Sequence, residues 1–261
     1  MSGVISETGN RNAAGGAGAS RAVKRALVTG GSGAIGAAIC RRLAADGCHV
    51  YVHANSRLEQ AQAVVQEIIA AGGAAHAVAF DVADAQATGA VLQQVLDAGP
   101  IQVLVNNAGI HDDAVMPGMR AAQWARVINV SLNGFFNVTQ PLLMPMIGTR
   151  WGRIINLSSV AAITGNRGQA NYAAAKAGLH GASKSLALEV ASRNITVNVI
   201  APGIIATPMS EEAFSKEMIA GMVPMKRAGT PEEVAALAGF LASEGASYIS
   251  GQVISVNGGM I

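Results

Sequence analysis

The sequence predicts an α/β fold, a doubly wound parallel sheet of seven strands with helices on both faces. Short apolar runs typical of buried strands alternate with longer segments of helical periodicity along most of the 261 residues. A glycine-rich turn also joins the first predicted strand to the first predicted helix. Strands and helices that alternate in this way form parallel sheets through right-handed crossovers, which place helices on both faces.

The first half of the chain contains three strand–helix units. Strands are expected where β-branched and other apolar residues run together, at 24–29, 49–53 and 75–80. Helices are expected where apolar residues recur every three or four positions, at 35–46, 58–71 and 86–98. Gly47 ends the first helix and Gly72-Gly73 the second, because glycine is favoured just after a helix.

The second half continues the alternation with longer helices. Strands are expected at 102–105, 153–157, 196–200 and 252–256. Two long helices are expected at 121–143 and 170–192, and two short helices at 211–221 and 231–242. Together with the first half, these elements supply the seven strands of the predicted sheet.

Length and composition indicate one domain without a nucleic-acid or membrane partner. A chain of this size is ordinary for one open α/β domain, which we expect to span 23–261. Residues 1–22 are rich in glycine, alanine, serine and asparagine, and we expect them to form a disordered tail. The formal net charge is only +2, and no apolar run reaches the roughly 18 residues of a membrane span.

Cysteine and histidine positions give no sign of a metal site. Cys40 and Cys48 form no C-x-x-C pair and no metal-ligand spacing occurs, so we expect a reduced, cytoplasmic protein without a metal. His49, His53 and His76 are scattered, and structural roles are expected for them.

The glycine-rich turn predicts a dinucleotide site. Glycines between a strand and a helix let the backbone approach a pyrophosphate, and the helix N-terminus offers free N–H groups. The expected cofactor-binding residues of the turn are Gly30, Ser32, Gly33, Ile35 and Gly36. This context makes the turn a Rossmann-type signal, which a glycine motif alone would not be.

The end of the second strand favours NADP(H) over NAD(H). An NAD site usually places a carboxylate there, but this chain has none before Glu59. Arg57 is suited to pair with a 2′-phosphate, and Asn55 and Ser56 to hydrogen-bond it. The alternative is that Arg57 merely occupies the first turn of a helix.

Two further strand ends carry candidate cofactor contacts. Asp81 and Val82 follow the third strand, where a polar group can contact adenine. Asn107, Ala108 and Gly109 follow the fourth. Ligands bind at the carboxyl ends of strands in open α/β sheets, so these residues are expected to meet at one site.

Three side chains form a candidate proton-delivery device. Tyr172 and Lys176 lie four residues apart and share a face of the helix at 170–192, and Ser159 lies thirteen residues before the tyrosine. A cation about 4 Å from the phenol would lower the phenol pKa by up to roughly three units. We therefore expect Tyr172 to act as a general acid or base, with Ser159 holding a substrate oxygen beside it.

These motifs together resemble the classical short-chain dehydrogenase/reductase family over residues 24–261. The family's ordered motifs recur at Asn106-Asn107-Ala108-Gly109, Ser159, Tyr172, Lys176 and Pro202-Gly203. Within the family, the segments 168–179, 195–203 and 256–260 are most similar to bacterial 3-oxoacyl-[acyl-carrier-protein] reductases. The segments 151–154 and 177–181 also resemble acetoacetyl-CoA reductases.

The resemblance implies roles for these residues. Tyr172 would protonate a carbonyl oxygen as NADPH delivers hydride to carbon, Lys176 would bind the nicotinamide ribose and depress the phenol pKa, and Ser159 would polarise the carbonyl. Pro202, Gly203, Ile205 and Thr207 would lie on the nicotinamide side. The segment 209–225 would be a mobile substrate lid.

The chain departs from the family pattern at two places. The family's fourth catalytic residue is an asparagine that helps to hold a water, and Ser131 occupies its position here. Serine is shorter but still hydrogen-bonds a water. The family has a glycine at the middle of the turn, and this chain has Ala34 there. An alanine is tolerable if that position has helical dihedrals.

The resemblance also implies partners. Arg150 and Arg193 match a pair of arginines that docks an acidic carrier protein, the alternative being that they are solvated surface arginines. The family is usually tetrameric, with the two long helices and the last strand as interfaces.

The function expected from the resemblance is NADPH-dependent reduction of 3-oxoacyl-[acyl-carrier-protein] thioesters in fatty acid, polyketide or polyene synthesis. Acetoacetyl-CoA reduction, or oxidation of another small secondary alcohol, is the alternative within enzymes. A catalytically silent NADP(H)-binding subunit of a complex is the alternative outside them, favoured only by Ser131 and Ala34.

Overall fold

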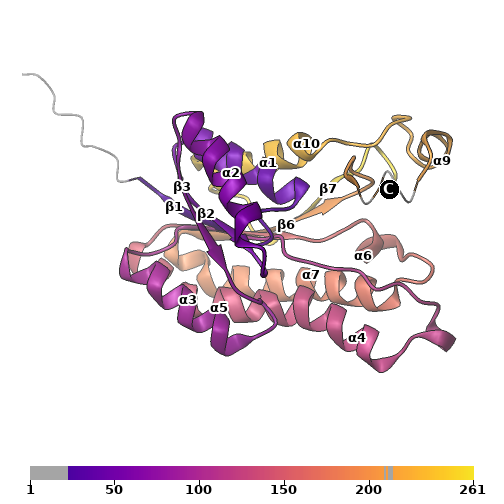
Figure 1. Cartoon of the computed structure of the whole chain (residues 1–261), viewed down its shortest axis with the longest axis horizontal. Coiled ribbons are helices and arrows are strands. Elements are labelled where there is room, and N and C mark those ends of the chain that lie inside the picture. The colour runs from indigo at the N-terminus through magenta and orange to yellow at the C-terminus, as the bar shows by residue number, and fades with distance from the viewer. Residues whose placement is uncertain (1–22, 209, 211–213) are drawn as a thin grey trace, which may run out of the picture.

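A computed structural model describes residues 23–208, 210 and 214–261 of the chain and confirms the predicted fold (Figure 1). Seven parallel strands form one sheet in the order β3-β2-β1-β4-β5-β6-β7. The strands are β1 (Arg25–Val28), β2 (His49–Ala54), β3 (Ala74–Ala79), β4 (Val103–Asn106), β5 (Gly152–Leu157), β6 (Ile195–Pro202) and β7 (Val253–Val256).

Helices cover both faces of this sheet, as Figure 1 shows. One layer contains α1 (Ala34–Ala45), α2 (Leu58–Ala70) and α10 (Pro231–Ala242). The other layer contains α3 (Ala85–Asp97), α5 (Gly134–Thr149) and α7 (Ala170–Val190), with α4 (Ala121–Ile128) extending it. Smaller elements are α6 (Ala161–Thr164), α9 (Lys216–Met222) and short helical turns at η1 (Met116–Gly118), η3 (Ala191–Arg193) and η4 (Glu244–Ala246).

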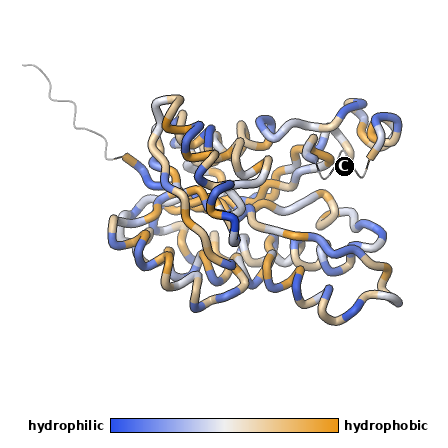
Figure 2. The backbone as a smooth tube through the Cα atoms, viewed as in Figure 1, coloured by the Kyte–Doolittle hydropathy of each residue, from blue (hydrophilic) through white to orange (hydrophobic). Residues whose placement is uncertain are grey.

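The apolar core is divided by the sheet into two clusters. The first packs α1, α2 and α10 against one face through residues such as Ile39, Leu43 and Leu241. The second packs α3, α5 and α7 against the other face through residues such as Leu92 and Leu142. Figure 2 shows apolar positions concentrated along the strands between the two helical layers. Burial on both faces is the reason that these strands are continuous apolar runs.

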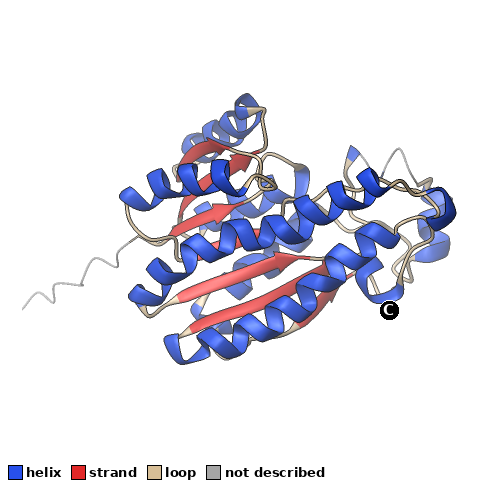
Figure 3. Cartoon of the chain, turned by 90° about the horizontal axis from the view of Figure 1, so that it is seen from below, coloured by secondary structure: helices blue, strands red, loops and turns tan. Residues whose placement is uncertain are grey.

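The order of the strands positions the ligand site. The chain winds outward from β1 to β3, then crosses to β4 and winds in the opposite direction to β7. All strands are parallel, so their carboxyl ends share one edge of the sheet, to which the arrows point in Figure 3. Ligands of open α/β sheets bind outside these ends, at the point where the winding reverses. That point lies between β1 and β4. The glycine-rich turn follows β1, and Asn107 directly follows β4.

The prediction of one continuous helix at 121–143 is wrong in one respect. It is divided by a wider π-helical turn, η2 (Asn129–Asn133), which separates α4 from α5, and α5 continues to Thr149 through Pro141 and Pro145. Gly134, the residue directly after the π-helical turn, packs closely on Val82, because a Cβ on Gly134 would lie 2.9 Å from Val82 Cγ2. Apolar periodicity does not report one extra residue within a turn, so the sequence did not predict this feature.

The other differences are small. The short helix α6 after β5 was not predicted, and β6 extends two residues further than expected, to Pro202. The helix expected at 211–221 is observed as α9, from Lys216 to Met222, and its predicted part at 211–213 lies outside the described residues. Among the residues that the structure describes, no helix combines the length and apolar character needed to cross a membrane.

Candidate active site

A cleft of about 440 Å³ opens at the carboxyl ends of β5 and β6. It extends from Ile35 in the first turn of α1 to Tyr172 in the first turn of α7. Ser159 lines the same cleft, as do Pro202, Gly203, Ile205 and Thr207. The candidate catalytic pair and the residues expected on the nicotinamide side therefore share one space.

Ser159 is placed by the turn that leaves β5. This strand is buried along its whole length and ends at Leu157, and α6 begins two residues after Ser159. The Ser159 Oγ accepts a 3.2 Å hydrogen bond from the backbone N–H of Ala161, which fixes its side chain at the entrance to α6. The hydroxyl remains half-exposed and faces the cleft.

Asn171 anchors the N-terminus of α7 and thereby positions Tyr172. The side chain of Asn171 is fully buried and donates a 2.9 Å hydrogen bond to the Asp112 carbonyl, in the loop after β4. Its oxygen accepts a 2.8 Å hydrogen bond from the backbone N–H of Tyr172. Asn171 thus ties the catalytic helix to the loop that follows β4.

Lys176 lies behind Tyr172, away from solvent. Its side chain is 3% exposed, its Nζ donates a 2.7 Å hydrogen bond to the Leu157 carbonyl, and the same Nζ lies 5.8 Å from the centre of the Tyr172 ring. Burial lowers the pKa of Lys176 to about 8. The ammonium is therefore still largely charged at neutral pH.

The expected lowering of the Tyr172 pKa is wrong. Burial raises the pKa of the phenol above its ordinary value, and the nearby Asp113 carboxylate raises it further. A hydrogen bond with Ser159 acts in the opposite direction, with an effect smaller than that of burial but larger than that of Asp113. Local helix spacing reveals a neighbouring cation but not the loss of water around the phenol, which disfavours the phenolate. Tyr172 is therefore a protonated phenol at neutral pH.

Ser131 lies in the π-helical turn and points toward the same region. It is buried, and its Oγ has no hydrogen-bond partner among the described residues. A Cβ added at Gly109 would lie 2.9 Å from Lys176 Nζ and 3.5 Å from Ser131 Oγ. Lys176 and Ser131 therefore flank one point of the backbone at Gly109, beside a small cavity of about 10 Å³ that Ser131 also lines.

The glycine-rich turn forms a close backbone cradle. Gly30 has φ of +61°, a left-handed conformation that favours glycine, and a Cβ on Gly36 would lie 2.2 Å from the Gly30 carbonyl oxygen. Ala34 is the first residue of α1 and has negative φ, so its methyl group is tolerated, as expected for helical dihedrals at this position. The first N–H groups of this helix have no partner within it and point toward the turn.

The ends of β1 and β4 are joined by a hydrogen-bond network. The Asn107 side chain donates bonds of 2.9 and 3.0 Å to the carbonyls of Thr29 and Gly30. The Thr29 Oγ1 accepts bonds of 3.0 Å from the N–H groups of Asn107 and Ala108. This network fixes the turn beside the strand that leads to Gly109.

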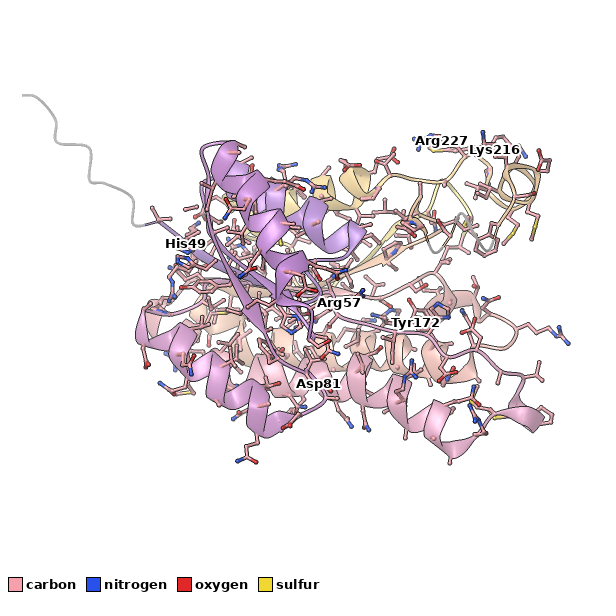
Figure 4. The ribbon with its side chains drawn as sticks, in the orientation of Figure 1. His49, Arg57, Asp81, Tyr172, Lys216 and Arg227 are labelled. Carbon is pink, nitrogen blue, oxygen red and sulfur yellow. The ribbon has the colours of Figure 1, made fainter. Side chains whose placement is uncertain are left out.

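The residues expected on the adenosine side lie at the same edge of the sheet. Figure 4 labels Arg57 and Asp81 toward the end of the sheet that carries Tyr172, while His49 lies at the opposite end. Arg57 immediately precedes α2 and is exposed, as are Asn55 and Ser56. Asp81 is exposed and Val82 buried after β3. These positions leave the polar groups available to a ligand.

The residues present fit a dinucleotide. The space at Gly36 admits no side chain, the start of α1 presents backbone N–H groups, and the cleft continues from Ile35 to Tyr172. Gly203 closes the far side, where a Cβ would lie 2.8 Å from Asn257 Cβ. At Gly36 and Gly203 the backbone is therefore packed too closely for any side chain.

Sequence reasoning missed two groups of site residues. A polar chain runs along the cleft from His111 through Asp113 and Gln169 to Asn166, with atom separations of 3.2, 2.8 and 2.9 Å. His53, for which only a structural role was expected, contacts the Gly30 N–H directly. Each group joins residues far apart in the sequence, and no local pattern indicates them.

Arg150 and Arg193 lie away from the cleft of their own chain. Arg150 directly follows α5 and lies just before β5, and Arg193 lies just before β6. Both exposed arginines therefore lie at the amino ends of strands, whereas Ser159 and Tyr172 lie at the carboxyl ends. The 21-residue α7 separates Tyr172 from Arg193 by roughly 30 Å at about 1.5 Å per residue.

Comparisons with known proteins agree with this geometry. The short chain dehydrogenase family matches residues 24–218. The chain is 44% identical over 236 residues to a 3-oxoacyl-[acyl-carrier-protein] reductase of Aggregatibacter actinomycetemcomitans, covering 90% of this chain and 98% of the relative. It is 47% identical over 238 residues to a Synechocystis 3-oxoacyl-[acyl-carrier-protein] reductase, covering 90% and 96%. It is 43% identical over 240 residues to nodulation protein G of Azospirillum brasilense, covering 91% and 98%.

The matched residues contain the glycine-rich turn, Ser159, Tyr172 and Lys176, and the relatives extend the similarity over most of the chain. The chain therefore belongs to the short-chain dehydrogenase/reductase family of oxidoreductases, which use a nicotinamide cofactor.

Proposed function

We propose that this protein reduces 3-oxoacyl thioesters carried by an acyl carrier protein to 3-hydroxyacyl thioesters, with NADPH as the reductant. The observation that carries the proposal is the meeting of Ser159 and Tyr172 in one cleft, with the Lys176 ammonium buried behind the phenol. The similarity to 3-oxoacyl-[acyl-carrier-protein] reductases supports the choice of substrate.

In the proposed reaction, Ser159 and Tyr172 hold the oxygen of the 3-oxo group. The nicotinamide supplies a hydride to the carbonyl carbon when the cofactor is bound. The protonated phenol of Tyr172 gives its proton to the carbonyl oxygen, and its raised pKa keeps that proton available at neutral pH. Ser159 fixes the oxygen beside the phenol, so that the proton has a short path.

Lys176 stabilises the phenolate that forms when Tyr172 releases its proton. Its ammonium is fixed by the Leu157 carbonyl at 2.7 Å and is excluded from water. Electrostatic stabilisation of a developing charge is stronger in a site from which water is excluded. Ser131, on the other side of Gly109, is the remaining candidate for a hydrogen bond within this region.

The choice of NADP(H) rests on the end of β2. The chain contains no carboxylate between this strand and Glu59, and Arg57, Asn55 and Ser56 are all exposed there. A guanidinium binds a phosphate through charge-assisted hydrogen bonds. A 2′-phosphate bound at Arg57 would also lie near the positive end of α2, which begins at the next residue.

The proposed carrier-docking role of Arg150 and Arg193 requires more than one chain. The two arginines lie at the end of the sheet opposite to the cleft, so a carrier docked there would deliver its thioester to another copy. The proposed homotetramer supplies such a copy through the exposed apolar side chains of α5 and α7, namely Phe136, Met144 and Leu188, which are 62%, 71% and 85% exposed.

The test is NADPH oxidation with acetoacetyl carrier protein, run beside acetoacetyl-CoA and an NADH control. We expect turnover on the carrier thioester with NADPH to exceed turnover on the CoA thioester and with NADH. The docking role is tested with Arg150→Ala and Arg193→Ala, which should raise KM for the carrier thioester alone. Absence of turnover on both thioesters, while NADPH still binds, would contradict the proposal.

A further inference from the structure

His53 occupies a buried position beneath the glycine-rich turn. It is the penultimate residue of β2 and is 2% exposed. Its ring packs against the Phe80 ring, with the ring centres 4.1 Å apart. A buried imidazole needs partners for both nitrogens, and here both partners are backbone groups of the two segments expected to hold the cofactor.

The hydrogen bonds of His53 determine its tautomer. The backbone N–H of Gly30 donates to Nδ1 at 2.9 Å, and an N–H group has no other role than donor. The Nδ1 atom therefore carries no proton. The other ring nitrogen of His53, Nε2, carries the proton and donates a 2.8 Å hydrogen bond to the Phe80 carbonyl. The imidazole is thus neutral, with one acceptor and one donor in use.

The two partners belong to different walls of the predicted dinucleotide site. Gly30 begins the glycine-rich turn, and Phe80 directly precedes Asp81 and Val82, the segment expected beside adenine. The His53 carbonyl also accepts a 3.3 Å hydrogen bond from the Ser32 N–H. His53 therefore makes two hydrogen bonds with the turn, and one hydrogen bond and one ring contact with Phe80.

We infer that His53 is a positioning residue that holds the glycine-rich turn and the segment after β3 at a fixed separation, and thereby sets the affinity for the pyrophosphate of the cofactor through Gly30 and for its adenosine through Phe80. The inference rests on the proposed cofactor site. Gly30 has positive φ and its N–H is directed at the ring, so the bond constrains the conformation of the turn as well as its position.

Two substitutions separate the two hydrogen bonds. In His53→Asn, the amide oxygen lies near the former Nδ1 position and keeps an acceptor for Gly30, while the donor to Phe80 is lost. In His53→Gln, the amide nitrogen lies near the former Nε2 position and keeps the donor to Phe80, while the acceptor for Gly30 is lost. His76→Asn, on the adjacent strand β3 and exposed, is the matched control.

The measurement is direct binding of NADPH and of adenosine 2′,5′-bisphosphate, which lacks the pyrophosphate and nicotinamide. We expect His53→Asn to weaken both ligands by about tenfold, because the adenine-side segment loses its support. We expect His53→Gln to weaken NADPH by about tenfold and to leave the bisphosphate unchanged. The control should bind both ligands as the unsubstituted chain does.

Unchanged affinity for both ligands in both His53 variants would overturn the inference, as would equal weakening of both ligands in all three variants. If a variant does not fold, ¹⁵N NMR of the unsubstituted chain with labelled histidines measures the tautomer of His53 and tests the inference instead. A neutral Nε2–H tautomer of His53 at pH 7 supports the inference, and an Nδ1–H tautomer or an imidazolium overturns it. An unsubstituted chain that binds no NADPH would instead contradict the proposed function.

Discussion

Lys176 Nζ donates a 2.7 Å hydrogen bond to the carbonyl of Leu157, and this bond joins the helix that carries Tyr172 to the strand that leads to Ser159. The ammonium is buried without a carboxylate among the causes of its pKa shift. The Lys176 ammonium therefore interacts with the Leu157 carbonyl and, in the proposed reaction, with the phenolate of Tyr172.

Replacing Lys176 by Met is expected to stabilise the fold while abolishing turnover. The folded-state pKa of about 8 lies below the usual 10.5, so the unfolded chain binds more protons between these values. Burial of the charge therefore costs about 3 kcal/mol below pH 8, a cost that disappears as pH rises from 8 to 10.5. Allowing about 1 kcal/mol for the lost hydrogen bond, we expect the free energy of unfolding at pH 7 to rise by about 2 kcal/mol.

Urea denaturation at pH 7 measures this change. Lys184→Met, an exposed position on the same helix, is the control and should change stability little. A Lys176→Met variant that is less stable than the unsubstituted chain would show that its hydrogen bond outweighs the cost of burying the charge.

Replacing Tyr172 by Phe should reduce turnover by about a thousandfold while leaving NADPH affinity within about twofold. General acid catalysis contributes about 10²- to 10⁴-fold, and the phenol is the group whose raised pKa keeps a proton available. NADPH oxidation and direct NADPH binding measure the two effects. Tyr248→Phe, at a fully exposed position, is the control. Retained activity in the Tyr172 variant would make the acid assignment wrong.

Replacing Ser131 by Ala should lower turnover about tenfold and leave the stability of the fold unchanged or higher by about 1 kcal/mol. The buried hydroxyl has no partner among the described residues, so its removal leaves no new unsatisfied group. Thermal unfolding and NADPH oxidation on the same preparation separate the two effects. Unchanged turnover would remove Ser131 from the candidate catalytic residues.

Replacing Arg57 by Ala should raise KM for NADPH by about ten- to a hundredfold and leave KM for NADH unchanged, because charge-assisted hydrogen bonds contribute about 1.5–3 kcal/mol. Initial rates with each cofactor measure the change. Arg41→Ala removes an exposed arginine from the middle of α1 and is the control. An equal effect on both cofactors would show that Arg57 does not recognise the 2′-phosphate.

Acid should destabilise the chain through His53. Burial lowers its pKa from 6.5 to about 4, against the opposing effects of the Phe80 carbonyl and the facing Asp81. Its contribution to stability is complete above pH 6.5 and is lost as pH falls toward 4, by up to about 3 kcal/mol. Urea denaturation at pH 7, 5.5 and 4.5 should show a smaller loss for His53→Asn than for the unsubstituted chain. Equal losses would contradict this contribution.

The fold was predictable because its signals are local. Apolar runs and helical periodicity locate the strands and most helices. The four-residue spacing of Tyr172 and Lys176 is also local, whereas the roles of these residues and of Ser159 were expected from the family resemblance. The parts that sequence did not predict depend on contacts between distant segments.

Tyr172 and His53 illustrate this limit. The sequence shows a lysine four residues from Tyr172 but not the burial that raises the phenol pKa. It shows a histidine at the end of an apolar strand but not the Gly30 and Phe80 backbone groups that contact its two nitrogens. Solvent exclusion and long-range hydrogen bonds arise only when the chain has folded.

The π-helical turn from Asn129 to Asn133 allows this part of the chain to lose one residue without changing the packing of α5. An α-helix advances about 100° per residue, and a π-turn accommodates one residue more than an α-helical turn. Substitution of Ser131 changes one chemical group. Deletion of one neighbouring residue within the turn would instead remove the extra residue, so that α4 and α5 would merge into one regular helix and α5 would keep its contacts with α3. Deletion of one residue within α5 would rotate the following side chains of α5 by about 100° away from those contacts. In the evolution of this protein, loss of a residue is therefore expected to be tolerated better at this turn than within α5.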